Sequence, residues 1–261
     1  MKIIFQSDDY GITKAAACGC LEAIHHGVIR NTGFFTNMPW ADEVFSWIKP
    51  DLDKIAFGID LNASTGPSIL PHSEVPHLTH ENGQFLGSRE NRALDNDENN
   101  HDHLADCRDE LYREFDAQIQ KYIELVGKKP DYIHNHAYGT KTTEEVTKEL
   151  AKKYDVVTST DVMERDDVKL VGMGWYQFGG PEVQLKEDLT SFLTSDHDGI
   201  LTSGKEYAYI VCHCGYADAE LFQLSSFNLC RVKDLEAMTS DELKKWVADN
   251  HLELASFKEL R

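Results

Sequence analysis

The stretch that decides the fold is KIIFQSDDYG, at residues 2–11. Its apolar start predicts a short buried strand over residues 2–6, and two adjacent carboxylates follow almost at once. A helix is predicted next, over residues 13–26, with Gly27 as its C-terminal stop. A buried strand, a polar turn and a helix in this order favour an α/β fold.

The rest of the chain repeats this alternation. Further extended segments are predicted at residues 28–35, 55–61, 130–136, 155–159, 168–171 and 207–212. Further helices are predicted at residues 39–48, at 104–126, from 142 onward, and in a segment ending near 250. Capping-box spacing places helix starts at Thr142 and Thr239. We therefore expect one domain, residues 1–261, with a mainly parallel sheet closed as a complete or irregular (β/α) barrel.

Residues 62–103 interrupt the alternation. They are rich in glycine and proline and end in the polar run DNDENNHDH. Loops of this length in compact domains are usually functional or disordered. We interpret the segment as a long loop or lid with a small excursion of regular structure.

Composition narrows the classes of function. The 26 Lys and Arg residues against 45 Asp and Glu give a net charge of -19, which disfavours binding to nucleic acid or anionic lipid. No run approaches the ~18 apolar residues of a membrane span, and the N-terminal apolar stretch is too short for a signal peptide. We expect a cytoplasmic protein whose six cysteines, none in a C-x-x-C pair, are mostly buried, reduced thiols.

Carboxylates end two of the predicted strands. Asp8 and Asp9 are adjacent, so they repel each other unless a cation lies between them or one is protonated. A divalent metal would satisfy one and leave the other as a base, although either could simply cap the helix that follows. Asp60, at the end of the strand over 55–61, suits a ligand or, more commonly, a turn.

Histidines end two more strands. His134 and His136 are two residues apart and therefore face the same side of an extended strand. Both could approach one metal, or one could ligate while the other supports it. His213 follows the apolar strand over 207–212 and suits general-acid chemistry, because its unperturbed pKa is ~6.5. A dyad with Cys214 is disfavoured, because neighbours on a strand face opposite sides.

With these motifs in order, the chain resembles the YdjC/ChbG family of carbohydrate deacetylases. The resemblance spans nearly the whole chain and is carried by SDDYG at 7–11, GVIRNTGFFTNMPWADE at 27–43, GIDLNASTGPSILP at 58–71, EVPHLTHENGQFLG at 74–87, PDYIHNHAYG at 130–139 and YIVCHCGYAD at 209–218. It implies a barrel related to polysaccharide deacetylases, a small carbohydrate substrate and a homodimer as an allowed assembly.

The resemblance also implies a divalent metal, usually magnesium in the family. Asp9 and His136 match metal ligands, and Asp60 stands in place of the family's other metal histidine. A carboxylate there favours magnesium or manganese over zinc. His134 replaces an aspartate beside the ligands, where it would affect the orientation of His136.

The implied reaction is hydrolysis of the N-acetyl group of a small amino sugar or chitooligosaccharide, phosphorylated or not. The metal, held by Asp9, Asp60 and His136, would polarise the carbonyl and a water. Asp8 matches the base, and His213 matches the histidine of the family's H-P-G motif, expected to be the acid; Cys214 replaces the proline of that motif.

Two other functions stay open from the sequence. Asp8 and Asp60 could be the carboxylate pair of a glycosidase or of a hydrolase that cleaves a phospho-disaccharide. The substitutions at positions 60 and 134 also allow a non-catalytic sugar-binding protein on the same fold. Stacking of a sugar ring is considered for Tyr10, Trp40 and Tyr138. Arg231 either contacts a carboxylate or phosphate or braces the fold, and bracing is favoured.

Overall fold

The computed structural model describes residues 1–95 and 102–260, so part of the polar run before residue 103 lies outside the described residues. The strands are β1 Lys2–Tyr10, β2 Asn31–Phe34, β3 Ala56–Leu61, β4 Ile133–Asn135, β5 Val168–Leu170, β6 Tyr207–Cys212 and β7 Glu253–Leu254. The helices are α1 Lys14–His26, α2 Ala41–Ile48, α3 Ser88–Leu94, α4 Arg108–Val126, α5 Lys141–Tyr154, α6 Ser159–Met163, α7 Pro181–Gln184, α8 Leu189–Thr194, α9 Ala219–Leu224, α10 Leu229–Thr239 and α11 Asp241–Asp249.

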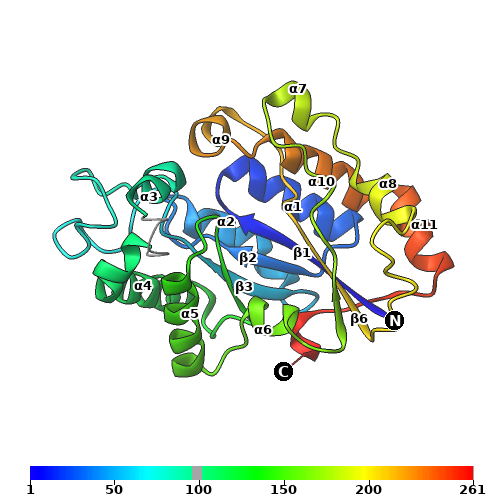
Figure 1. Cartoon of the computed structure of the whole chain (residues 1–261), viewed down its shortest axis with the longest axis horizontal. Coiled ribbons are helices and arrows are strands. Elements are labelled where there is room, and N and C mark those ends of the chain that lie inside the picture. Colours follow the sequence, from blue (N-terminus) through cyan, green and yellow to red (C-terminus); the bar gives the residue numbers. More distant parts are fainter. Residues whose placement is uncertain (96–101, 261) are drawn as a thin grey trace.

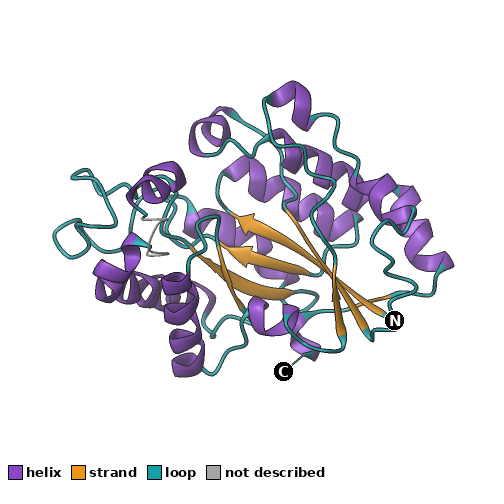
Figure 2. Ribbon diagram, in the orientation of Figure 1, coloured by secondary structure: helices purple, strands orange, loops and turns teal. Residues whose placement is uncertain are grey.

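The strands form one parallel sheet in the order β4-β3-β2-β1-β6-β5, and β7 pairs with the start of β1. Figure 2 shows this sheet at the centre of the molecule, with helices packed around it. Helix α1 lies beside β1 and packs on α10, whereas α4 lies beside β3 and α5 lies beside β4 (Figure 1). The sheet is a partial barrel, which confirms the predicted α/β, barrel-like class.

The two faces of the sheet have different roles, as β1 shows. Ile3 and Phe5 pack in the larger apolar cluster, together with residues of the surrounding helices. Ile4 instead packs with Tyr209 and Phe257 in a smaller cluster on the inner face. Because side chains alternate along a strand, the inner-face positions continue at two-residue steps toward the C-terminal ends of the strands. On that face the apolar layer gives way to polar side chains.

Two predicted helix starts are wrong by one or two residues. Thr140, not Thr142, caps α5: its backbone is extended and its side chain accepts a hydrogen bond from the N–H of Thr143. Ser240, not Thr239, caps α11 in the same way. In both cases the capping hydroxyl belongs to the residue whose backbone is extended, as an N-cap requires, whereas the predicted residue is already helical.

The predicted strand at 155–159 is also wrong. It is reduced to one bridge, between Ile133 and Thr158, because Thr158 already caps α6. The long loop does contain regular structure: α3 lies in it, and Pro67–Gln84 and Thr79–Phe85 form isolated antiparallel bridges. Its role as a lid and the single-domain assignment stay predictions. Among the described residues no helix has the length and apolar character needed to cross a bilayer.

Candidate active site

The C-terminal ends of four strands bring together a group of titratable side chains, here called the strand-end cluster: Asp8, Asp9, Asp60, His134, His136 and His213. A bulge at the end of β1 determines how Asp8 and Asp9 are oriented. The pairing of β1 with β2 shifts between Ser7 and Tyr10, and Asp9 has a left-handed backbone with φ 66°. A regular strand would send adjacent side chains to opposite faces, whereas a bulge re-aims them. Asp8 and Asp9 can therefore both reach, across the curved sheet, the histidines at the C-terminal end of β4.

Asp9 lies at the centre of the cluster and is 2% exposed. Its Oδ1 is 2.7 Å from Nδ1 of His136, and its Oδ2 accepts a hydrogen bond of 2.6 Å from Nη2 of Arg231. Burial alone would raise the pKa of Asp9, but the charges of His136 and Arg231 outweigh it and hold that pKa well below the usual range. Asp9 is thus a buried carboxylate that is fully engaged by protein groups.

Asp8 forms a second ion pair, with His134. Its Oδ2 is 3.1 Å from Nε2 of His134, and its Oδ1 accepts a hydrogen bond from Gln6, which in turn is held by Tyr209. Burial would lower the pKa of His134, yet the charge of Asp8 and its hydrogen bond raise it to about 9. The same pair holds the pKa of Asp8 below its ordinary value despite burial. His134, expected beside the predicted metal ligands, contacts the predicted base.

Asp60 contacts the backbone of Asp9. Its Oδ2 accepts a 2.6 Å hydrogen bond from the backbone N–H of Asp9, while its Oδ1 is buried without a hydrogen-bond partner among the described residues. The carboxylate rests against Gly33, where an added Cβ would come within 1.7 Å of Oδ1. Burial, together with the negative charge of Asp8, raises the pKa of Asp60 well above its usual range.

The predicted ligands Asp9, Asp60 and His136 are therefore neighbours, but their donor atoms do not fit a divalent ion as folded. Both oxygens of Asp9 are occupied by cationic or N–H groups, and Asp60 is turned toward the Asp9 backbone. In residues 1–95 and 102–260, no three His, Cys, Asp or Glu side chains are arranged as a metal site.

His213 faces the cluster from the end of β6, with Nε2 4.0 Å from Oδ2 of Asp9. On its other side, Nδ1 is 3.1 Å from the hydroxyl of Tyr176, which donates a 2.6 Å hydrogen bond to Oδ2 of Asp234. Burial lowers the pKa of His213 to about 4 and raises that of Asp234 to about 7. The imidazole is therefore neutral at pH 7.

Sequence reasoning missed Tyr176 and Asp234. Tyr176 belongs to no motif, so nothing in the sequence marks it. A weak signal for Asp234 exists: it lies three residues after Arg231 on α10, and residues at this spacing share a helix face.

Three other side chains considered from the sequence are buried and have structural roles. Arg231 is 2% exposed and donates both to Asp9 and, through Nε, to the carbonyl of Phe227, so it braces the cluster. Tyr10 is fully buried and donates to the Val44 carbonyl, so it is a core residue and cannot stack on a sugar. Cys214 is buried; among the described residues all six thiols are free and five are buried.

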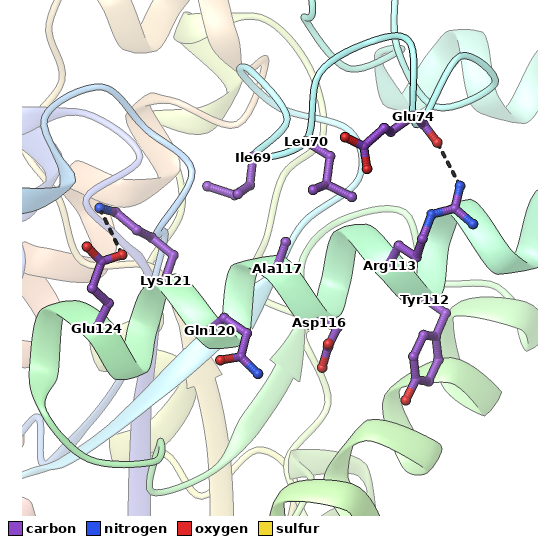
Figure 3. Close-up of a pocket in the computed structure, with 10 residues that line it drawn as sticks. All are labelled: Ile69, Leu70, Glu74, Tyr112, Arg113, Asp116, Ala117, Gln120, Lys121 and Glu124. Carbon is purple, nitrogen blue, oxygen red and sulfur yellow. Dashed lines mark hydrogen bonds and ion pairs between the residues drawn. The ribbon is translucent and has the colours of Figure 1, made fainter.

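A groove of about 620 Å³ lies elsewhere, between the loop near Leu70 and the outer face of α4 (Figure 3). A hydrogen bond from Arg113 to the carbonyl of Glu74 crosses it. None of the cluster residues lines it, so the groove contributes nothing to the chemistry described above.

Comparison with known proteins finds similarity over nearly the whole chain. The family model described as "YdjC-like protein" matches residues 2–249. A carbohydrate deacetylase of Listeria monocytogenes serotype 4a is 29% identical over 265 residues, with all of both chains covered. A carbohydrate deacetylase of Enterococcus faecalis is 27% identical, covering 99% of this chain and 98% of the relative. A solved structure from Enterococcus faecalis V583, described as a cellobiose-phosphate cleavage protein, has a TM-score of 0.79 at 26% identity, with 99% and 98% of the two chains covered.

Proposed function

The chain belongs to the YdjC-like protein family, and we propose that it is a hydrolase that removes the N-acetyl group from a small amino sugar or chitooligosaccharide, phosphorylated or not. The names of its relatives as carbohydrate deacetylases support the reaction class. One structural observation carries the proposal. Asp8 and His213, two groups suited to opposite proton transfers, border the same buried centre at the C-terminal ends of parallel strands.

In this proposal Asp8 takes a proton from the attacking water. His134 holds Asp8 in place and keeps it ionised beforehand. His213 supplies the proton that the departing amine needs. Because burial holds its imidazole neutral at pH 7, His213 first takes up a proton at Nε2 from solvent water, and Asp8 returns the proton that it accepted to solvent after the amine has left. The balanced outcome is one amide and one water converted to one protonated amine and one acetate.

Metal dependence stays a prediction. Magnesium, or manganese or zinc, held by Asp9, Asp60 and His136 would require Asp9 to give up a protein partner and Asp60 to turn away from the Asp9 backbone. The two proton transfers above are assigned to side chains alone. A cytoplasmic location, a homodimer and the absence of nucleic-acid and membrane partners likewise stay predictions.

The test is acetate release from N-acetylated chitobiose and its 6-phosphate, with and without EDTA. We expect Asp8→Asn and His213→Asn to lower the rate by about 10²-fold or more, the usual contribution of a proton-transfer group. Asp42→Asn, an exposed change on α2, is the matched control for the loss of a carboxylate and should have no effect.

Three results would contradict the proposal. Unchanged acetate release in Asp8→Asn would remove the assigned base. Cleavage of a phosphorylated disaccharide without acetate would favour the glycosidase function. Tight sugar binding without turnover under any divalent ion would favour a binding protein.

A further inference from the structure

A buried chain of hydrogen bonds lies behind His213, on the side away from the strand-end cluster. Asp234 is fully buried and Tyr176 is 7% exposed. Oδ2 of Asp234 accepts two hydrogen bonds, one from the Tyr176 hydroxyl at 2.6 Å and one from the backbone N–H of His213 at 2.7 Å. Asp234 therefore holds both the backbone of His213 and the side chain that touches its ring.

The number of protons on each group decides which atom donates and which accepts in the hydrogen bonds that join Asp234, Tyr176 and His213. A tyrosine hydroxyl has one proton, and while Asp234 is ionised this proton is directed to its Oδ2, which also accepts the backbone N–H of His213. The Tyr176 oxygen can then only accept from its other neighbour, Nδ1 of His213, at 3.1 Å. A neutral imidazole has one N–H, so Nε2 carries no proton and presents its lone pair toward the cluster.

Aromatic packing holds the hydrogen-bonded side chains of Tyr176 and His213 in place. The Phe227 ring lies edge-on to Tyr176 with centroids 4.7 Å apart, and edge-on to His213 at 5.0 Å. Trp175 covers Tyr176 with centroids 4.8 Å apart. Aromatic walls exclude water, which would otherwise compete for the Tyr176 hydroxyl and for Nδ1.

One helix supports both sides of the cluster. Arg231 and Asp234 are one turn apart on α10, and they reach Asp9 and His213 respectively. The position of α10 thus sets the spacing between the central carboxylate and the imidazole.

We infer that Tyr176 and Asp234 are positioning residues, which hold His213 in the Nδ1–H tautomer and direct Nε2 into the site. The role of this tautomer in turnover rests on the proposed deacetylase function. The tautomer itself does not, because it follows from the buried contacts of His213.

The experiment is NMR of the ¹⁵N-labelled full chain, with the ring nitrogens of His213 assigned by their loss in His213→Asn. We expect the resting protein at pH 7 to show a protonated Nδ1 and an unprotonated Nε2. In Tyr176→Phe the acceptor for Nδ1–H is gone while the ring remains. We expect the population to move toward the Nε2–H tautomer that free histidine prefers.

The kinetic readout separates positioning from packing. In Tyr176→Phe we expect kcat to fall about 10²-fold with KM changed by less than about twofold, since misdirected proton transfer affects the chemical step. Tyr154→Phe is the matched control, because that hydroxyl also donates to a carboxylate, Asp116 at 2.7 Å, but on α5. It should leave both the His213 signals and kcat unchanged.

Two outcomes overturn the inference: an Nε2–H tautomer in the unmodified protein, or ring signals unaltered in a folded Tyr176→Phe. The first does not depend on Tyr176→Phe, so it decides the matter even where that variant fails to fold. If no acetate is released from any sugar, the proposed function fails and the NMR result still stands by itself.

Discussion

Replacing Arg231 with methionine would leave Asp9 as a buried carboxylate without its guanidinium partner. The two side chains are each about 2% exposed, and the N–O distance between them is 2.6 Å. Removing one member of a buried ion pair typically costs about 3–5 kcal/mol, because the remaining charge stays desolvated. The carbonyl of Phe227 also loses the donor Nε. We expect Arg231→Met to lower the free energy of unfolding by about 4 kcal/mol, a large part of a typical total of about 5–15 kcal/mol.

A second change distinguishes the lost pair from lost packing. Asp9→Asn in the Arg231→Met background removes the carboxylate charge that has lost its guanidinium, although it also removes the charge that His136 faces, so the double variant should regain about 2 kcal/mol rather than the whole loss. Arg165→Met is the control, because Arg165 and Asp167 are also 2.6 Å apart but 36% exposed. An exposed pair contributes about 0–1 kcal/mol.

The assay is urea unfolding followed by tryptophan fluorescence, with midpoints compared at unchanged m-value. The reasoning is refuted if Arg231→Met costs no more than Arg165→Met, or if Asp9→Asn recovers nothing in the double variant. Either result would mean that Asp9 gains no net stabilisation from the guanidinium.

Three further predictions concern stability and local order. Gly33→Ala should cost about 1–3 kcal/mol in thermal unfolding, because the new Cβ would lie 1.7 Å from Oδ1 of Asp60, and Asp60→Ser should relieve much of that cost. Burial would raise the pKa of Asp51, but its hydrogen bond from His25 helps hold that pKa below 3.8. Asp51→Asn should therefore lower the free energy of unfolding near pH 6, and the difference from wild type should shrink as the pH falls below about 4. A difference that does not change with pH would contradict this. Glu114→Gln should speed hydrogen exchange at residues 69–70, whose N–H groups it binds at 2.9 Å, while exchange in β1 stays as in wild type.

Local pattern was enough to predict where the polar side chains gather at the strand ends. The apolar run at residues 2–6 predicts a strand whatever the rest of the chain does, because burial of alternate side chains is a property of the strand itself. Period-two alternation likewise places His134 and His136 on one face, and parallel strands bring their C-terminal ends to one edge. Asp9 and His136, 127 residues apart, do meet there, at 2.7 Å.

The partners of these groups could not be predicted in the same way. Strand alternation puts Asp8 and Asp9 on opposite faces, and only the bulge with φ 66° at Asp9 lets both serve the site. The backbone hydrogen bond that turns Asp60 away from a shared ion depends on where that bulge places the Asp9 N–H. The residues of the predicted metal set are therefore neighbours, and their role as ligands stays a prediction that would require Asp9 and Asp60 to exchange their present partners.

The sequence by itself determined where the six strands β1 to β6 lie, though not β7, and which of their ends are polar, and hence where the polar side chains would gather. Tertiary structure alone decided what each polar group contacts: Arg231 with Asp9 across 222 residues, and Tyr176 and Asp234 behind His213. The physical reason is the separation along the sequence of the residues that interact. Periodicity reflects contacts within a few residues, whereas a buried charge is satisfied by whichever distant side chain the packing brings within about 3 Å.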